Sequence, residues 1–291
     1  MARTEPVWTS SDWACEQALE RAVTYVAAVR GAPGAGRVRA AASRSGVRAL
    51  ASLVAELPVV EAPLSATPSG EELRSWFRPD RRLPFDRLPV ALLRLPATQA
   101  DYLRGRPRQA LRTNLKRAAE AGLGCAVLAD GPELQRSVEQ VARLRGQDPG
   151  TLVRTEGRVR LDRQFVVVHD AAGDPVALSE AVVDGDWAGL GALVIALGHA
   201  DNQVMRYLLH AETVAGLIGR GVGSLTVAGS MLFTSAGTRY FQRRTGFQPV
   251  WLRPVVRSAV PRAVPVPAAA AAVPLPVPRP AAEGERVRAR A

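Results

Sequence analysis

The stretch ALVIALGHADNQVMRYLLHAETVAGLIGRGVGSLTVAG, from Ala192 to Gly229, decides the fold of this chain. Its first six residues are a short, β-branched apolar run that is typical of a buried strand. After a polar loop, the segment Val204 to Gly219 places apolar residues at helical spacing. A second apolar run, Ser224 to Gly229, predicts another strand. The sequence then predicts a short helix over 238–244, the pair Gly246-Phe247, and a third strand over 249–252.

The residues upstream continue this alternation of strands and helices. A basic helix is predicted from Tyr102 to Ala121, and turns with Gly beside Asp at 173–174 and 185–186 predict two hairpins. Nearer the N-terminus we expect a helix over 8–29, a helix or partly buried strand over 47–57, and a Pro/Ser loop over 61–70. The other expected elements are strands over 88–95, 124–128, 164–169, 175–184 and 187–197, and a helix over 132–145.

Composition limits the class of protein. The 291 residues are 47% hydrophobic and 22% charged, as in a globular protein, and no apolar run approaches the ~20 residues that span a bilayer. No signal-peptide pattern is present at the start, so we expect a cytoplasmic protein with no membrane partner. Cys15 and Cys125 lie far apart and are expected to be reduced. The net charge of +11 indicates anionic partners such as phosphates, nucleotides or RNA, or reflects GC-rich coding of arginine.

The ordered set from Gly124 to Arg253 resembles the GNAT acyltransferase fold. The segment Tyr240 to Phe247 is similar to the helix that ends in Gly-Phe in that superfamily, and Arg106 to Gly122 resembles a basic helix of the Fem-like branch. The resemblance implies an α/β (α+β) fold with a mixed, mostly antiparallel sheet flanked by helices and preceded by a smaller N-terminal unit. We expect an N-terminal unit over 1–122 that is a partial GNAT-like half, an acyltransferase domain over 123–258, and a Pro/Ala-rich disordered tail over 259–291.

The resemblance also implies a donor site for acyl-CoA, with acetyl-CoA as the expected co-substrate. Its pyrophosphate would lie at the start of the helix that follows the strand ending near 197, because the first N–H groups of a helix are unpaired. Gln203 and Met205 stand where glycines are usual, and Ala200 where Gln or Arg is usual. The implied donor-binding residues are Leu197, His199, Asn202, Gln203, Met205, Arg206 and Tyr207.

Acyl transfer to an amine needs a base and an acid for the departing thiolate. Glu180, a carboxylate inside an apolar strand, is the candidate base, and an outward-facing strand residue is the alternative. The superfamily's acid position holds Gln242, so Tyr240 is the candidate acid, against a packed tyrosine. Ser230 is a candidate substrate contact. The three histidines lack metal-ligand spacing, and we expect no metal and a His210 that faces solvent or a partner helix.

The expected function is N-acyl transfer from acyl-CoA to a primary amine of a small molecule, peptide or protein. Arg104, Arg108, Arg112 and Lys116 recur at four-residue spacing on the basic helix. This stripe could follow the phosphates of a tRNA or could be a solvated helix face. Two alternatives therefore stay open: an aminoacyl-tRNA-dependent Fem-like transferase, and a GNAT-like binding protein without catalysis.

Overall fold

A single eight-stranded sheet organises the protein. The computed structural model describes residues 10–77, 88–153, 160–196, 198 and 201–257. Across the sheet the strands run in the order β1-β8-β2-β7-β6-β5-β4-β3, and the pairs β1/β8 and β6/β7 are parallel whereas the others are antiparallel. The strands are β1 (Val59–Leu64), β2 (Leu88–Arg94), β3 (Gly124–Leu128), β4 (Arg163–His169), β5 (Pro175–Asp184), β6 (Trp187–Ile195), β7 (Ser224–Val227) and β8 (Gln248–Val256).

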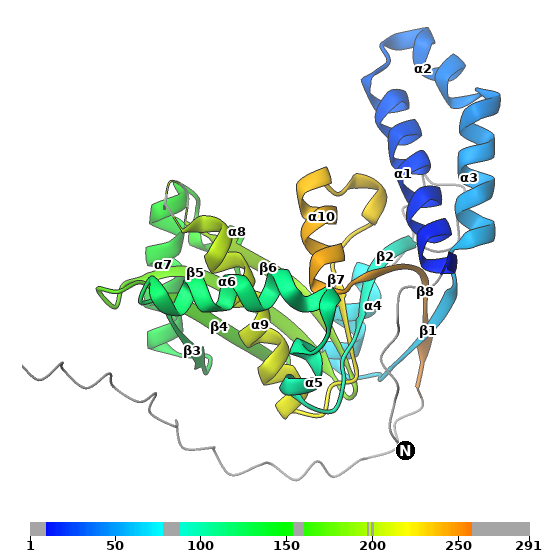
Figure 1. Cartoon of the computed structure of the whole chain (residues 1–291). Helices are drawn as coiled ribbons and strands as arrows, with labels where there is room; N and C mark the ends of the chain where they lie inside the picture. Colours follow the sequence, from blue (N-terminus) through cyan, green and yellow to red (C-terminus); the bar gives the residue numbers. More distant parts are fainter. Residues whose placement is uncertain (1–9, 78–87, 154–159, 197, 199–200, 258–291) are drawn as a thin grey trace, which may run out of the picture. The chain divides into compact units, whose positions relative to one another are not determined.

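Helices cover both faces of this sheet (Figure 1). Alternate residues of β5 identify the faces: Ser179 Oγ lies 2.6 Å from Thr213 Oγ1 on α9, whereas Leu178 packs with α7 and Val182 packs with α4. The helices are α1 (Ser10–Gly31), α2 (Gly34–Ala41), α3 (Arg44–Glu56), α4 (Pro68–Trp76), α5 (Gln99–Leu103), η1 (Arg106–Arg108), α6 (Gln109–Glu120), α7 (Pro132–Arg145), α8 (Pro149–Leu152), α9 (Asn202–Gly219), η2 (Met231–Phe233) and α10 (Ala236–Thr245).

The element order predicted from Gly124 onward is confirmed. The chain runs β3, α7, β4, β5, β6, α9, β7, α10, β8, with only short helical turns added. The expected fold class, a mixed and mostly antiparallel sheet with flanking helices, is also confirmed. The predicted helix over 8–29 is α1, and the ambiguous segment 47–57 is helix α3.

Strands from the N-terminal part complete the sheet. β2 lies between β7 and β8 and is antiparallel to both, and β1 adds to the outer edge of β8. The prediction of a loop over 61–70 was wrong at both ends, because Val59–Leu64 pairs with Trp251–Val256 and helix α4 begins at Pro68. An edge strand tolerates Pro63 because one side of it needs no ladder bonds. Residues on both sides of position 122 therefore belong to one sheet.

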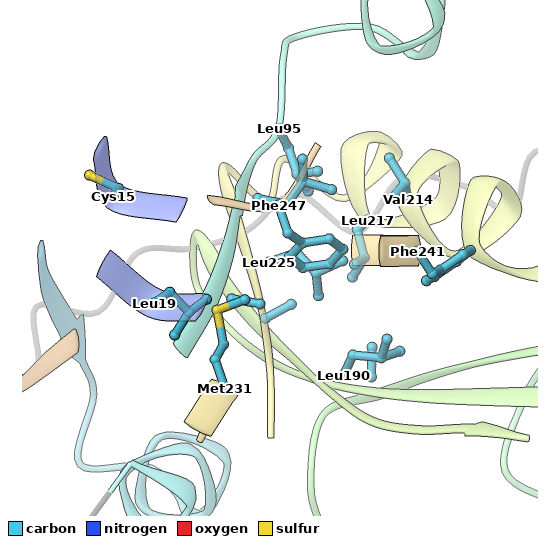
Figure 2. Close-up of a cluster of buried hydrophobic side chains, with 14 of the residues drawn as sticks. Cys15, Leu19, Leu95, Leu190, Val214, Leu217, Leu225, Met231, Phe241 and Phe247 are labelled. Atoms are coloured by element: carbon cyan, nitrogen blue, oxygen red, sulfur yellow. The ribbon is translucent and has the colours of Figure 1, made fainter. Parts of the chain in front are cut away.

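The largest core cluster joins segments that are distant in sequence (Figure 2). It brings together Cys15 and Leu19 of α1, Leu190 of β6, and Phe241 and Phe247 around the end of α10. Burying these apolar side chains stabilises the contact between α1 and the second half of the chain. Trp251 Nε1 adds a buried hydrogen bond of 3.2 Å to the carbonyl of Leu53 on α3.

The basic helix is interrupted, so the prediction of one helix from Tyr102 to Ala121 was wrong. α5 ends at Leu103, and Gly105, at a φ of 87°, turns the chain before α6 begins at Gln109. Arg112 stabilises this break by donating to the carbonyls of Leu103 and Gly105 at 2.5 and 2.7 Å. Of the other basic residues, Arg104 pairs with Asp101, Arg108 lies over the Tyr102 ring, and Lys116 pairs with Glu120. The stripe is therefore not one continuous cationic face.

Candidate functional site

Strands β6 and β7 separate after a short parallel pairing. Trp187–Leu190 pair with Ser224–Val227, and β6 then continues to Ile195 while β7 ends. Burial changes at the same point, because the first four residues of β6 are buried, Gly191 is exposed, and the next three are half-buried. We call this separation beyond Leu190 and Val227 the β6–β7 fork.

A β-bulge bends β6 at the fork. Glu180 of β5 pairs with Ala192 and Ala181 pairs with Leu190, so Gly191 is the extra residue. An extra residue bends its strand and increases the local twist, which accounts for the divergence from β7.

The fork leaves part of the β6 backbone without a strand partner on one side. The N–H of Ala196 bonds to the carbonyl of Val176, so by alternation the N–H and C=O groups of Leu193 and Ile195 point away from β5. Arg145 of α7 donates to the carbonyl of Ile195 at 2.6 Å. Among the described residues, Leu193 has no strand partner on that side. Its amide and carbonyl can therefore bond an extended ligand in the fork.

Helix α9 begins just after the fork. Its first turn contains no acidic residue, and the N-cap residue Asp201 makes no side-chain cap. The N–H groups of Asn202, Gln203 and Val204 precede the first i→i−4 bond, which Met205 makes to Asp201. Gln203 is exposed, and Asn202 Nδ2 lies 3.4 Å from the carbonyl of Ala196. The predicted donor residues Leu197 and His199 lie outside the described residues, as does Ala200.

The next three predicted donor residues pack against protein. The side chain of Met205 is fully buried in the core with Ile195, and its predicted role in donor binding stays untested. The Arg206 guanidinium lies 5.6 Å from the centre of the Phe241 ring, and the Tyr207 and Phe241 rings are 5.1 Å apart. These three side chains hold α9 against the residues that surround it.

Tyr240 lies in a group of arginines on α10. Tyr240 is 46% exposed, its hydroxyl accepts a hydrogen bond from Arg244 Nε at 3.0 Å, and the Arg243 guanidinium lies 5.6 Å from the centre of its ring. The same group influences the pKa of the nearby Tyr207. Burial raises this pKa, Tyr240 raises it further, and Arg244 and Arg206 oppose the shift. Tyr207 therefore keeps its proton at neutral pH.

Ser230 caps a turn. Its hydroxyl accepts a hydrogen bond from the N–H of Leu232 at 3.3 Å, at the start of η2. The prediction of a substrate contact there stays untested, and the structure shows a local stabilising role.

Glu180 lies beside the fork. It is 7% exposed and points to the face of the sheet that α4 and α7 cover, since its neighbours Leu178 and Val182 pack there. A Cβ placed on Gly191 would lie 3.7 Å from Glu180 Oε2. Arg163 Nε lies 3.2 Å from Glu180 Oε1 and compensates the buried charge. α10, with Tyr240, packs on α9 at the opposite face, so the two predicted catalytic residues do not share one face.

Three residues that the sequence analysis missed lie on the same face of the sheet as Glu180. Arg163 is its ion-pair partner, Trp76 of α4 would lie 3.0 Å from a Cβ on Gly191, and Thr226 is a buried residue of β7 on the same face. Among the described residues the Thr226 hydroxyl has no hydrogen-bond partner. The glycine at 191 was the available signal, because glycine inside an apolar strand indicates a bulge or a close approach.

A buried hydrogen-bonded group joins α5, α9 and α10. The Tyr102 hydroxyl donates to the carbonyl of Thr245 at 2.9 Å and lies 2.8 Å from His210 Nε2, which therefore carries the proton of the neutral ring. Of the two expectations for His210, exposure to solvent was wrong, because the residue is fully buried. Burial, with a smaller effect of Arg108, lowers the pKa of His210 to about 3. His210 is thus neutral at physiological pH and positions helices.

Within the described ranges, no three His, Cys, Asp or Glu side chains come together in a way that could hold a metal ion. None of the described helices has the length and apolar character needed to cross a bilayer.

The chain was compared with known proteins. No protein-family model and no curated protein matches it. Similar solved structures include L-PGS from Bacillus licheniformis, with 11% identity and a TM-score of 0.38 over 56% of this chain and 58% of that one. FemX is similar with 8% identity and a TM-score of 0.40 over 56% of this chain and 59% of that one. A tandem GNAT protein from the clavulanic acid biosynthesis pathway is also similar, with 15% identity and a TM-score of 0.36 over 76% of this chain and 70% of that one. The matched region spans little more than half of L-PGS and of FemX. The order of helices and strands from Gly124 to Val256, and the order of the strands in the sheet, form the GNAT-like arrangement that the sequence predicted.

Proposed function

We propose that this protein is a GNAT-type N-acyltransferase that moves an acyl group from acyl-CoA to a primary amine of a small molecule, peptide or protein. The observation that carries the proposal is the β6–β7 fork, where an exposed glycine and an unpartnered stretch of strand edge lead directly to a helix N-terminus. Acetyl-CoA is the expected donor, and when bound it supplies a thioester carbonyl that an amine can attack.

The residues of the fork fit such a donor. Leu193 can bond the amide groups of an extended pantetheine arm through its N–H and C=O, as a strand edge bonds an added strand. The first turn of α9 can bind the pyrophosphate through the N–H groups of Asn202, Gln203 and Val204, since this turn contains no acidic residue and the carboxylate of the N-cap residue Asp201 does not cap these groups. The chain as a whole carries a net charge of +11, which attracts an anionic donor.

Glu180 is the proposed base. The attacking amine is an ammonium ion in water and must lose a proton, and the Glu180 carboxylate lies next to the bulge at the start of the fork. It can accept this proton directly or through a water molecule. Arg163 holds the carboxylate in place, and Thr226 offers a buried hydroxyl on the same face. Tyr240 remains the proposed acid, and its contact with Arg244 places a cation at the hydroxyl.

The test is acetyl-CoA turnover with a panel of primary amines, comparing the wild type with Glu180→Gln. We expect the variant to lose at least a hundredfold in kcat while it still binds acetyl-CoA, because general-base catalysis contributes about 10² to 10⁴. Glu120→Gln, at an exposed position on α6, is the control and should retain full activity. No turnover by the wild type with any acyl-CoA, together with no binding, would refute the proposed function.

A further inference from the structure

The N-terminal helices carry an uncompensated group of arginines. From Arg21 to Ala55 the chain contains six arginines and no acidic residue. In the structure α1 and α3 lie side by side, and α2 joins them at one end (Figure 1, blue). Tyr25 fixes this arrangement, because its ring occupies the space that a side chain at position 46 would need and its hydroxyl donates to the carbonyl of Ala41. The helices therefore present their charges from a defined scaffold.

Two of the six arginines have structural partners. Arg21 Nη2 donates to Ser52 Oγ at 2.9 Å, and the Arg30 guanidinium lies 5.4 Å from the centre of the Phe233 ring. The other four are exposed and have no acidic partner among the described residues. We call them the arginine tip, and they are Arg37 and Arg39 of α2 and Arg44 and Arg48 of α3.

Several arginines elsewhere in the chain differ from the arginine tip. Arg74, Arg163, Arg220, Arg239, Arg243 and Arg253 each pair with a carboxylate. In the arginine tip, Arg44 and Arg48 are four residues apart on one helix and repel each other. An anionic partner would relieve this repulsion.

The chemistry of the surface selects the partner. Within residues 34–48, which contain the arginine tip, the exposed large apolar side chains are Val38 and Val47, 73% and 58% exposed, whereas helices that insert into a membrane surface use Trp, Phe and Leu. Charge must therefore provide the affinity, and the planar guanidinium matches phosphate oxygens in a bidentate geometry. From 34 to 48 the chain has only Arg, Ser, Gly, Ala and Val, so it lacks amide and aromatic side chains for base contacts, and its guanidinium groups are left to bind the phosphates.

We propose that the arginine tip binds the phosphodiester backbone of a double-helical nucleic acid, without base recognition. The partner is a duplex RNA stem or a duplex DNA. This inference does not depend on the proposed acyl transfer, because neither the β6–β7 fork nor α9 contributes to it.

The experiment measures binding of the full chain to a fluorescent RNA hairpin and to a DNA duplex, by anisotropy over a series of salt concentrations. The tip variant carries Arg37→Gln, Arg39→Gln, Arg44→Gln and Arg48→Gln. A control variant loses the same charge at exposed positions of α6 and α7, through Lys116→Gln, Arg117→Gln, Arg136→Gln and Arg143→Gln. Circular dichroism and the thermal midpoint verify that both variants fold.

We expect the tip variant to bind at least tenfold more weakly and its salt slope to fall by about 3 to 4, since each lost phosphate contact removes about 0.9. The control variant should change affinity less than twofold. Similar binding of RNA and DNA would indicate backbone contacts common to both, and tip-dependent binding of only one would identify the source. Equal losses in both variants, or no binding of either duplex, would overturn the inference. Tip-dependent binding to phosphatidylglycerol vesicles without duplex binding would also overturn it.

Discussion

The buried His210 should make the stability of the protein depend on pH between 7 and 5. Its ring is fully buried, and its pKa in the folded protein is about 3, against 6.5 for an ordinary histidine. As the pH falls below 6.5, the unfolded chain binds a proton at this residue and the folded chain does not. Stability from this group is therefore complete above pH 6.5 and is lost as the pH falls towards 3.

The magnitude follows from linkage. Each pH unit between the two pKa values costs about 1.4 kcal/mol, so lowering the pH from 7 to 5 should remove about 2 kcal/mol of the free energy of unfolding. His210→Gln is the matched variant, because glutamine can donate to the Tyr102 hydroxyl and does not titrate. All other titrating groups are shared, so the difference between the two proteins isolates this residue.

Urea unfolding followed by circular dichroism at pH 7 and pH 5 measures the effect. The wild type should lose about 2 kcal/mol more than the variant over this range. If both proteins lose the same free energy, the neutral, buried state of His210 is refuted. The hydrogen-bonded group with Tyr102 and Thr245 would then not be a pH-sensitive connection between α9 and α10.

Three glycine substitutions test other parts of the structure. Gly246→Ala should destabilise the protein by about 2 kcal/mol, because residue 246 has a φ of 92° and the new Cβ would meet the Arg108 guanidinium. An unchanged thermal midpoint would contradict this packing. Gly46→Ala should cost about 1–3 kcal/mol in urea unfolding by displacing the Tyr25 ring, and a neutral effect would show that α1 and α3 do not pack this closely. Gly191→Val should weaken acetyl-CoA binding at least tenfold by filling the start of the β6–β7 fork, whereas wild-type affinity would place the donor elsewhere.

The elements from Gly124 onward could be predicted from sequence because each has a local signal. The apolar runs have the length of strands, and a glycine at 246 in the left-handed region ends α10 as its position after the helix suggests. The N-terminal strands lack such signals. β1 contains Pro63 and is stabilised by its parallel pairing with the distant β8, which no local pattern reveals.

The candidate site was only partly predictable for the same reason. Glu180 was identified as a carboxylate inside an apolar strand, and the structure buries it beside the fork, whereas its predicted role as a base stays untested. Its partner Arg163 and the neighbouring Trp76 come from other elements, and only the fold brings them together. The prediction of a continuous arginine stripe was wrong because it required one continuous helix, whereas Gly105 interrupts that helix.

The most direct test of acyl-CoA binding at the fork is calorimetric titration of acetyl-CoA into the wild type and Gln203→Glu. Gln203 is exposed in the first turn of α9, so the substitution places a negative charge at the proposed pyrophosphate position without disturbing the core. Gln109→Glu makes the same change at the start of α6 and is the control. We predict that acetyl-CoA binds the wild type and the control equally and binds Gln203→Glu at least tenfold more weakly. Absence of binding to the wild type, or equal affinity in all three proteins, would contradict the proposed donor site.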